Sequence, residues 1–328
     1  MNDNSKVITI LCSHLCVGED IYPLTSNEWS IVAKRLLKHE MQPQDILKIS
    51  DEDMKMKLDF SDEDILRVKR LLDRAGSLAF EIEKYANIGI NIITRADYTY
   101  PSILKRKLGS KCPPIFYAAG NLNICNTQSI GFVGSRNIGD EEILNTKTLV
   151  EHAVDKSYTI VSGGARGVDQ TSVNCAVTKG GKIILYAADS MLRKLKEKEL
   201  LKAVRNEKAV VLSVAVPEAG FNTGFAMMRN KYIYAQSKGT IIIKSDYNKG
   251  GTWAGATEAL KNSWCNVCCI SEPRYKGNIE LIRLGAIPID SSWDFTFDET
   301  ATVPSARELR RKPTENCQLS IFDSLNVG

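Results

Sequence analysis

Apolar and polar residues follow two different periodic patterns along this chain of 328 residues. From about residue 26 to 86 the apolar positions recur every three or four residues, which is typical of amphipathic helices. Two Ser-x-x-Asp sequences, beginning at Ser50 and Ser61, resemble capping boxes with Asp in place of Glu, and they predict that helices begin there. We therefore expect a small helical domain over residues 1–86.

A segment of short, irregular elements follows the helical pattern. Residues 89–94 and 115–118 are brief apolar runs that predict strands, and residues 103–108 predict a short helix between them. Turn-forming sequences such as Gly120-Asn121 separate these elements. We expect this segment to lead into the main domain.

From Ser129 onward, short apolar runs alternate regularly with helical patterns. Continuously apolar strands that alternate with helices are typical of a parallel sheet covered on both faces. We expect an α/β fold over residues 87–297, a Rossmann-like parallel sheet whose ligands lie at the carboxyl ends of the strands. The predicted strands are 130–133, 158–161, 182–186, 209–214, 239–244, 266–271 and 286–289, and the main helices are 141–155, 168–178, 225–236, 249–262 and 279–284.

Three glycine-bearing loops connect predicted strands to the helices that follow them: GSR at 134–136, SGGARG at 162–167 and KGGT at 249–252. Glycine lets the backbone approach an anion closely, and the helix that follows presents free N–H groups and the positive end of its dipole. Arg136 and Arg166 add guanidinium groups that suit phosphate. Three such loops on one edge of a sheet favour an anion site over ordinary tight turns.

The loops do not match the common nucleotide-binding motifs. The sequence has no G-x-x-x-x-G-K-[ST] and no G-x-G-x-x-G after the first strand, which disfavours P-loop ATP hydrolysis and a dinucleotide cofactor. Asp169 and Glu258 are the acids expected near the loops, and we interpret Asp169 as a helix cap or a partner of Arg166 rather than a base. We identify no catalytic constellation, and we expect no enzyme activity, no cofactor and no metal.

The net charge of +4 is only mildly basic, so local clusters say more than the total. Arg229-Asn230-Lys231 lies on a predicted helix and suits either a phosphate contact or an ordinary surface turn. Residues 193–208 predict either a basic surface that contacts a phosphate backbone or an ordinary solvated helix face. Seven cations of that segment outnumber its three acids: Arg193, Lys194, Lys196, Lys198, Lys202, Arg205 and Lys208.

The cysteines indicate a reducing compartment. Most of the nine lie within apolar runs, as expected of buried thiols in a cytoplasmic protein. Cys265 and Cys268 form a C-x-x-C pair without further nearby ligands, and we interpret the pair as part of a buried strand. No apolar run is long enough to span a bilayer, and a secretory signal is not recognisable. We expect no membrane partner.

Together these features resemble the DNA-processing protein A (DprA/Smf) family. VGSR at 133–136, SGGARGVD at 162–169, an F…MRN sequence ending at Asn230 and the GGT helix at 250–262 occur in the family's order. The similarity covers roughly residues 85–290. It implies a SAM-like helical domain joined to an extended Rossmann fold that forms homodimers and binds single-stranded DNA. Family members also load a RecA-type recombinase during transformation or recombination.

The resemblance also implies which residues contact DNA. Departures elsewhere, such as Ser213-Val214 where the family has Ser-Glu, make DNA binding a firmer expectation than recombinase loading, and leave a role in phage defence open. A nucleotide sensor or nucleotide-cleaving enzyme of a related family is the alternative. By position, the DNA-phosphate pocket comprises Gly134, Ser135, Arg136, Gly163, Gly164, Arg166, Arg229, Asn230, Lys231, Gly251 and Thr252.

Residues 298–328 are polar, and we expect them to form a flexible tail. Within the tail, Gln318, Leu319, Ile321 and Phe322 resemble the short peptide by which bacterial DNA enzymes dock on the replication sliding clamp. An apolar pair on such a tail suits a hydrophobic groove, although a pentapeptide also recurs by chance.

Overall fold

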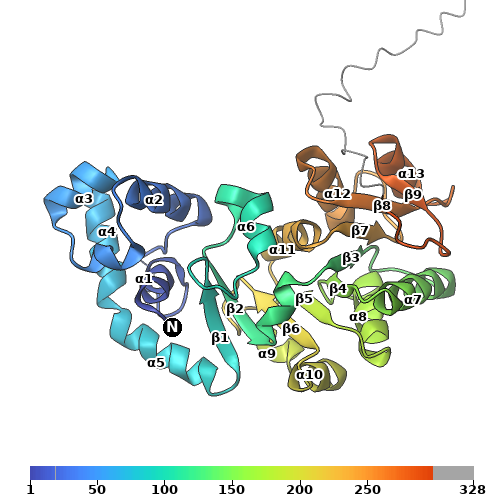
Figure 1. Ribbon diagram of the computed structural model, residues 1–328, viewed down its shortest axis with the longest axis horizontal. Coiled ribbons are helices and arrows are strands. Elements are labelled where there is room, and N and C mark those ends of the chain that lie inside the picture. Colours follow the sequence, from blue (N-terminus) through green and yellow to red (C-terminus); the bar gives the residue numbers. More distant parts are fainter. Residues whose placement is uncertain (19, 298–328) are drawn as a thin grey trace, which may run out of the picture.

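A helical region precedes a nine-stranded sheet that carries helices on both faces (Figure 1). The computed structural model describes residues 1–18 and 20–297. The clamp-like sequence at 318–322 therefore lies outside the described residues. The helices of the helical region are α1 (Asp3–Cys12), α2 (Ser26–Lys38), α3 (Asp51–Leu58), α4 (Asp62–Asp73) and α5 (Ala75–Ala86), with a 3-10 turn at Pro43–Leu47.

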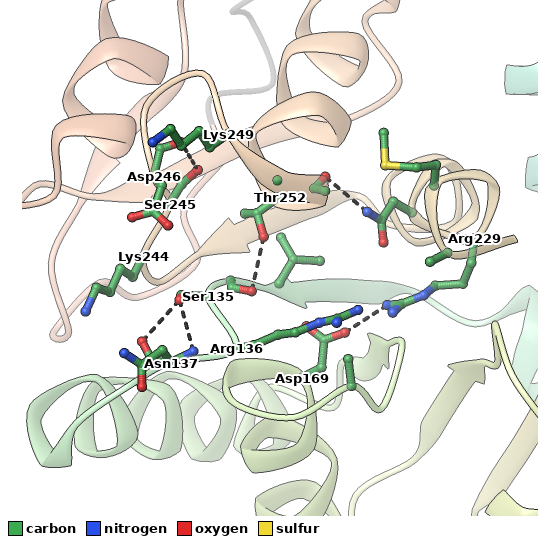
Figure 2. Close-up of a pocket in the computed structure, with 18 of the residues that line it drawn as sticks. Ser135, Arg136, Asn137, Asp169, Arg229, Lys244, Ser245, Asp246, Lys249 and Thr252 are labelled. Carbon is green, nitrogen blue, oxygen red and sulfur yellow. Dashed lines mark hydrogen bonds and ion pairs between the residues drawn. The ribbon is translucent and has the colours of Figure 1, made fainter. Parts of the chain in front are cut away.

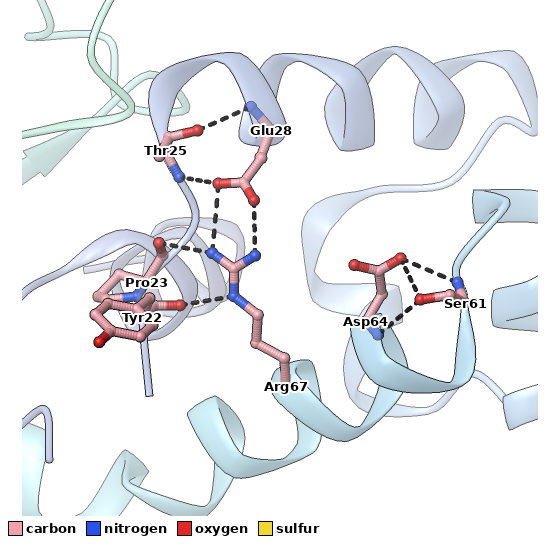
Figure 3. A network of polar contacts seen from close by, with 7 residues as sticks. All are labelled: Tyr22, Pro23, Thr25, Glu28, Ser61, Asp64 and Arg67. Atoms are coloured by element: carbon pink, nitrogen blue, oxygen red, sulfur yellow. Dashed lines mark hydrogen bonds and ion pairs between the residues drawn. The ribbon is translucent and has the colours of Figure 1, made fainter. Parts of the chain in front are cut away.

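Both predicted helix starts are present. Ser61 and Asp64 form a complete capping box, because the Ser61 backbone N–H donates to the Asp64 carboxylate at 3.0 Å and the Asp64 N–H donates to Ser61 Oγ at 3.1 Å (Figure 3). Ser50 caps α3 by accepting a hydrogen bond of 3.1 Å from the Asp53 N–H. Side chains that satisfy these otherwise free N–H groups mark where each helix begins.

A second capping box also joins two helices. Thr25 and Glu28 cap α2 reciprocally, and Arg67 of α4 donates to the same Glu28 carboxylate at 2.6 Å (Figure 3). Chiefly because of this hydrogen bond from Arg67, the pKa of Glu28 falls to about 2. Since Arg67 also donates to the carbonyl oxygens of Tyr22 and Pro23, it fixes α4 against the entry to α2.

The helix α1 precedes the residues whose apolar positions recur at helical spacing in the sequence. Val7 and Leu11 of α1 are completely buried, and they share one hydrophobic cluster with sheet residues such as Ile92 and Tyr117. The helical region thus packs directly on the sheet.

The sheet has the strand order β1-β2-β6-β5-β4-β3-β7-β8-β9. The seven strands from β6 to β9 in this order pair in parallel, as predicted, whereas β2 runs antiparallel to both β1 and β6. The segment expected to lead into the main domain therefore extends the same sheet as an antiparallel edge. Such an edge is common on parallel sheets. The strands are β1 (Ile90–Thr94), β2 (Ile115–Gly120), β3 (Ser129–Val133), β4 (Thr159–Ser162), β5 (Ile183–Tyr186), β6 (Ala209–Ser213), β7 (Gly239–Ile242), β8 (Asn266–Ile270) and β9 (Ile287–Ile289).

Side chains alternate along the strands between two hydrophobic clusters, one on each face. Cys268 belongs to one cluster and Cys265 to the other, so the two thiols of the C-x-x-C pair lie in different layers. Burial raises the pKa of both thiols. The helices of this part are α6 (Ser102–Leu108), α7 (Asp140–Asp155), α8 (Val168–Thr178), α9 (Met191–Lys194), α10 (Lys198–Arg205), α11 (Thr223–Gln236), α12 (Gly250–Asn262) and α13 (Lys276–Arg283).

The chain changes direction across the sheet at β3. From β3 it proceeds through β4, β5 and β6 on one side, and then returns to β7 on the other side of β3. Loops that leave neighbouring strands in opposite directions open a crevice at the carboxyl edge, where ligands of such sheets bind. None of the helices within residues 1–18 and 20–297 is long and apolar enough to cross a membrane.

Candidate anion-binding grooves at the carboxyl edge

The loops that follow β3 and β7 meet the beginning of α12 and the first half of α11 around a groove of about 510 Å³ (Figure 2). We call it the switch-point groove. It lies where the strand order reverses, as expected from the topology. Of the residues predicted from the sequence to contact DNA, seven line it: Gly134, Ser135, Arg136, Arg229, Asn230, Gly251 and Thr252.

Hydrogen bonds between the four elements hold this groove together. Thr252 Oγ1 donates to the Gly134 carbonyl at 3.1 Å, and Asn230 Nδ2 donates to the Gly251 carbonyl at 3.0 Å. The Ser135 N–H donates to the Lys244 carbonyl at 2.9 Å. Residues that lie far apart in the sequence are thereby fixed around one space, in which backbone groups can face a ligand.

A second groove, of about 440 Å³, adjoins the first. We call it the side groove. Its walls include Gly163, Gly164 and Arg166 from the loop after β4, and it shares Arg136 and Arg229 with the switch-point groove. Ten of the eleven residues predicted from the sequence therefore lie along two connected grooves.

Two glycines allow the loops to approach each other this closely. A Cβ atom on Gly163 would lie 1.3 Å from Nη1 of Arg229, so no side chain fits there. Gly167 has a φ of +87°, and a Cβ atom on it would lie 2.3 Å from the Ser135 carbonyl oxygen. Only glycine combines that conformation with that contact.

Arg229 is buried and already paired. Its Nη1 lies 2.8 Å from Oδ2 of Asp169, and the two side chains are only 8% and 7% exposed. The interpretation of Asp169 as a helix cap or a partner of Arg166 is therefore wrong: α8 begins without a side-chain cap, and Asp169 binds Arg229 of α11. Arg229 reaches Asp169 because α11 packs over the loop after β4, a contact between distant segments of the chain.

Arg136 and Arg166 have no such partner. Their loops touch, since Arg166 Nε donates to the Arg136 carbonyl at 3.3 Å, and both side chains are exposed. Among the described residues, no carboxylate lies within 4.0 Å of either guanidinium group. Two unpaired guanidinium groups at the junction of the grooves form a positively charged patch that can bind phosphate.

The two grooves are more cationic than acidic. Asp189 pairs with Arg193, and Asp169 with Arg229, which leaves Asp246 as the groove-lining acid without an ion pair in the described part of the chain. The beginning of α12 also faces this edge without a side-chain cap, so its first N–H groups are available to an anion. At the beginning of α8, by contrast, the N–H groups of Val168 and Gln170 already donate to the carbonyl oxygens of Ser135 and Ala165. Six cations line the grooves: Arg136, Arg166, Lys194, Arg229, Lys244 and Lys249.

Lys194 was assigned by the sequence pattern to a basic helix face, but the structure buries it. Its Nζ donates to the Gly164 carbonyl at 2.8 Å and pairs with Glu197 at 2.9 Å. The predicted basic helix at 193–208 is in fact two short helices, α9 and α10, with Lys194 at the end of the first. The Lys194 side chain is thus hydrogen-bonded to the glycine loop that follows β4.

Lys244 and Phe221 line the site but were missed from the sequence. Lys244 lies two residues after the end of β7, so its position near a carboxyl strand end was an available signal. Phe221 comes from the irregular loop after β6 and lines both grooves, with its ring centroid 5.6 Å from Cζ of Arg136. No periodicity marks such a loop residue.

A buried carboxylate holds Lys244 in place. Glu142 accepts hydrogen bonds from the Gly139 N–H at 2.8 Å, from Lys244 Nζ at 3.0 Å and from Tyr275 Oη at 3.0 Å. Burial alone would raise the pKa of Glu142, but these hydrogen bonds to the charged form outweigh it and lower the pKa to about 2.

Lys231 does not line either groove. It pairs with Glu258 of α12 at 3.2 Å and lines a different cavity on the other side of α11. Successive residues on a helix point about 100° apart, so Asn230 faces the switch-point groove while Lys231 faces away. The placement of Glu258 near the glycine loops is also wrong, because Glu258 lies on a later turn of α12 and pairs with Lys231.

Comparison with known proteins agrees with this architecture. The family described as DNA recombination-mediator protein A matches residues 91–298. The DNA processing protein DprA of Bacillus subtilis (strain 168) is 28% identical over 222 residues, which span 66% of this chain and 73% of that protein.

Two solved structures share the fold. The DNA processing protein A of Streptococcus pneumoniae has a TM-score of 0.61 at 20% identity, and the match covers 82% of this chain and 99% of that one. The protein of the same name from Helicobacter pylori, described with a single-stranded DNA binding mode, has a TM-score of 0.50 at 22% identity over 60% of this chain and 89% of that one. These likenesses confirm the Rossmann-like α/β fold.

Proposed function

This chain belongs to the DNA recombination-mediator protein A family, and from that premise we propose that it binds single-stranded DNA along the switch-point and side grooves. The observation that carries the proposal is the meeting of Arg136 and Arg166, both exposed and without a carboxylate partner in the described chain, beside three glycine loops. Guanidinium groups and free helix N–H groups bind the phosphates of DNA whatever its base sequence.

Phe221 supports single-stranded rather than duplex DNA as the ligand. Its side chain is 58% exposed where the two grooves meet, and it lies against the guanidinium group of Arg136. An exposed aromatic ring beside a cation suits stacking on an unpaired base, whereas the bases of a duplex are already stacked on each other. The ring therefore adds base contacts to a site that otherwise recognises phosphate.

Binding of labelled oligonucleotides at several salt concentrations tests the proposal. The Arg136→Ala/Arg166→Ala variant should weaken binding of all single-stranded sequences and reduce the slope of log affinity against log salt by about 1.4, since each phosphate contact contributes about 0.7 on single strands. Arg70→Ala, which removes an exposed arginine of α4 in the helical region, is the matched control and should change neither quantity. A salt-independent interaction, or equal losses in both variants, would contradict the proposal.

We further propose that the protein passes its bound strand to a RecA-type recombinase and acts as a homodimer in recombination or transformation. The family description as a recombination mediator supports the first point. Formation of recombinase filaments on strands coated with single-strand-binding protein tests it, and light scattering tests the dimer. The clamp-like sequence at 318–322 stays a prediction: deleting it should abolish binding to the sliding clamp and leave DNA binding intact.

A further inference from the structure

A third groove lies on the opposite side of α11 from the switch-point groove. It has a volume of about 350 Å³ and opens between α11, the beginning of α2 and the segment that leads into β2. We call it the α2–α11 groove. It is where the structure places Lys231, the one predicted DNA contact that does not face the other grooves.

The charges along this groove have one sign. Lys111 and Lys231 line it, and no Asp or Glu is among the described residues that do so. Lys111 is exposed and has no carboxylate within 4.0 Å in the described chain, whereas Lys231 forms an ion pair with Glu258 of the neighbouring helix. Burial and the nearby Arg74 lower the pKa of His14 at the groove edge, so its ring stays uncharged at neutral pH.

The floor of the groove is apolar. Phe225, Met228 and Tyr232 recur at helical spacing on one side of α11, and Pro113, Pro114 and Ile115 face them. Met228 is 40% exposed, so part of this apolar floor is open to solvent. Lysines above an apolar floor offer separate contacts to the phosphates and to the bases of a single strand.

The two sites are separated by one helix. Consecutive residues divide between them, because Met227 lines the switch-point groove and Met228 lines the α2–α11 groove. A helix with its side chains is roughly 10–12 Å across, so a flexible strand that leaves the first groove reaches the second by crossing α11.

We propose that the α2–α11 groove is an additional nucleic-acid site that binds the continuation of a single strand held in the switch-point groove. This inference rests on the proposed function. It assigns Lys111 and Lys231 to phosphates, and it assigns Phe225 and Met228 to bases. The helical region thereby becomes part of the DNA-binding surface, through the beginning of α2.

Oligonucleotides of two lengths test this site in the full chain. Lengths on the order of 4 and 16 nucleotides span the usual range for compact single-strand-binding folds, and only the longer can occupy both sites. The Lys111→Gln/Lys231→Gln variant should bind the long oligonucleotide several-fold more weakly, with a salt slope lower by about 1.4. Its affinity for the short one should match that of the unsubstituted protein. Lys156→Gln/Lys182→Gln, two exposed lysines at the opposite edge of the sheet, is the matched control.

Photo-crosslinking supplies a second measurement that does not depend on a substitution. A reactive base near the end of the long oligonucleotide should crosslink to peptides that contain Lys111 or Met228, and the short oligonucleotide should not. Equal losses for both lengths, unchanged affinity for the long one, or crosslinks confined to the switch-point groove would each overturn the inference. If the unsubstituted protein binds neither length, the proposed function itself fails, and the inference with it.

Discussion

Asp169 and Arg229 form an ion pair of 2.8 Å between α8 and α11, and both side chains are almost completely buried. Asp169 lines the switch-point groove and Arg229 lines both grooves, so the pair joins α8 to the helix that forms a wall of the site. Two buried charges are costly unless they stay together, which ties the integrity of the site to this contact.

We expect Asp169→Ala to lower the free energy of unfolding by about 3–5 kcal/mol, because it leaves the Arg229 charge buried without a partner. Urea unfolding measures the change. The double variant Asp169→Leu/Arg229→Met should recover much of the loss, since replacing a whole buried pair by apolar residues is often neutral. If the double variant instead loses as much unfolding free energy as the two separate substitutions together, the two side chains do not depend on each other.

Gly163→Ala should displace Arg229, because the new methyl group would lie 1.3 Å from Nη1 of the guanidinium group. We expect a lower melting temperature and weaker DNA binding from this single carbon atom. Gly76→Ala in α5 is the control: its methyl group meets no atom within 4 Å, and alanine favours helix by roughly 0.5–1 kcal/mol over glycine. Normal stability of Gly163→Ala would contradict the packing described here.

Glu142 should make stability depend on pH in the acid range. Its pKa in the folded protein is about 2, below the usual 4.5, so its contribution is complete above about pH 4.5 and is lost as the pH falls through about 2. We therefore expect Glu142→Gln to be less stable than the unsubstituted protein near neutral pH, with a difference that shrinks steadily below pH 4.5. Unfolding curves between pH 2 and 7 measure it.

Glu83→Gln, at an exposed position of α5, provides the comparison for that series. Its stability should follow that of the unsubstituted protein throughout. A Glu142→Gln deficit that stays constant with pH would mean that the hydrogen bonds from Gly139, Lys244 and Tyr275 do not favour the charged carboxylate.

Phe221 should contribute to DNA affinity without contributing to stability. Because its ring is 58% exposed, Phe221→Ala should leave the melting temperature unchanged and weaken single-strand binding by about 1–3 kcal/mol for one stacked base. Phe221→Tyr should retain the affinity. Phe80→Ala, which removes a phenylalanine of α5 that is 69% exposed, should have no effect. Abasic oligonucleotides should abolish the difference between the first variant and the parent.

Local patterns in the sequence suffice for most of the elements from β3 onward and for the glycine loops of this protein. Periods of two and of three to four residues reflect which side of a strand or helix is buried, so they locate the strands from β3 onward and the helices that follow them. Arg136 and Arg166 line the same groove because each sits in a loop whose place at the carboxyl edge follows from the alternation itself, while their contact with DNA stays a prediction.

Contacts between distant segments decide the remainder. The rotation of α11 about its axis places Asn230 in the groove and Lys231 behind it, and packing of α11 over the loop after β4 gives Arg229 its partner Asp169. The antiparallel edge and the position of Phe221 likewise depend on where the chain returns to the sheet. A periodic pattern records that a side chain is buried, but it does not record which neighbour buries it, and at this site the neighbour determines whether a charge is free to meet an anion.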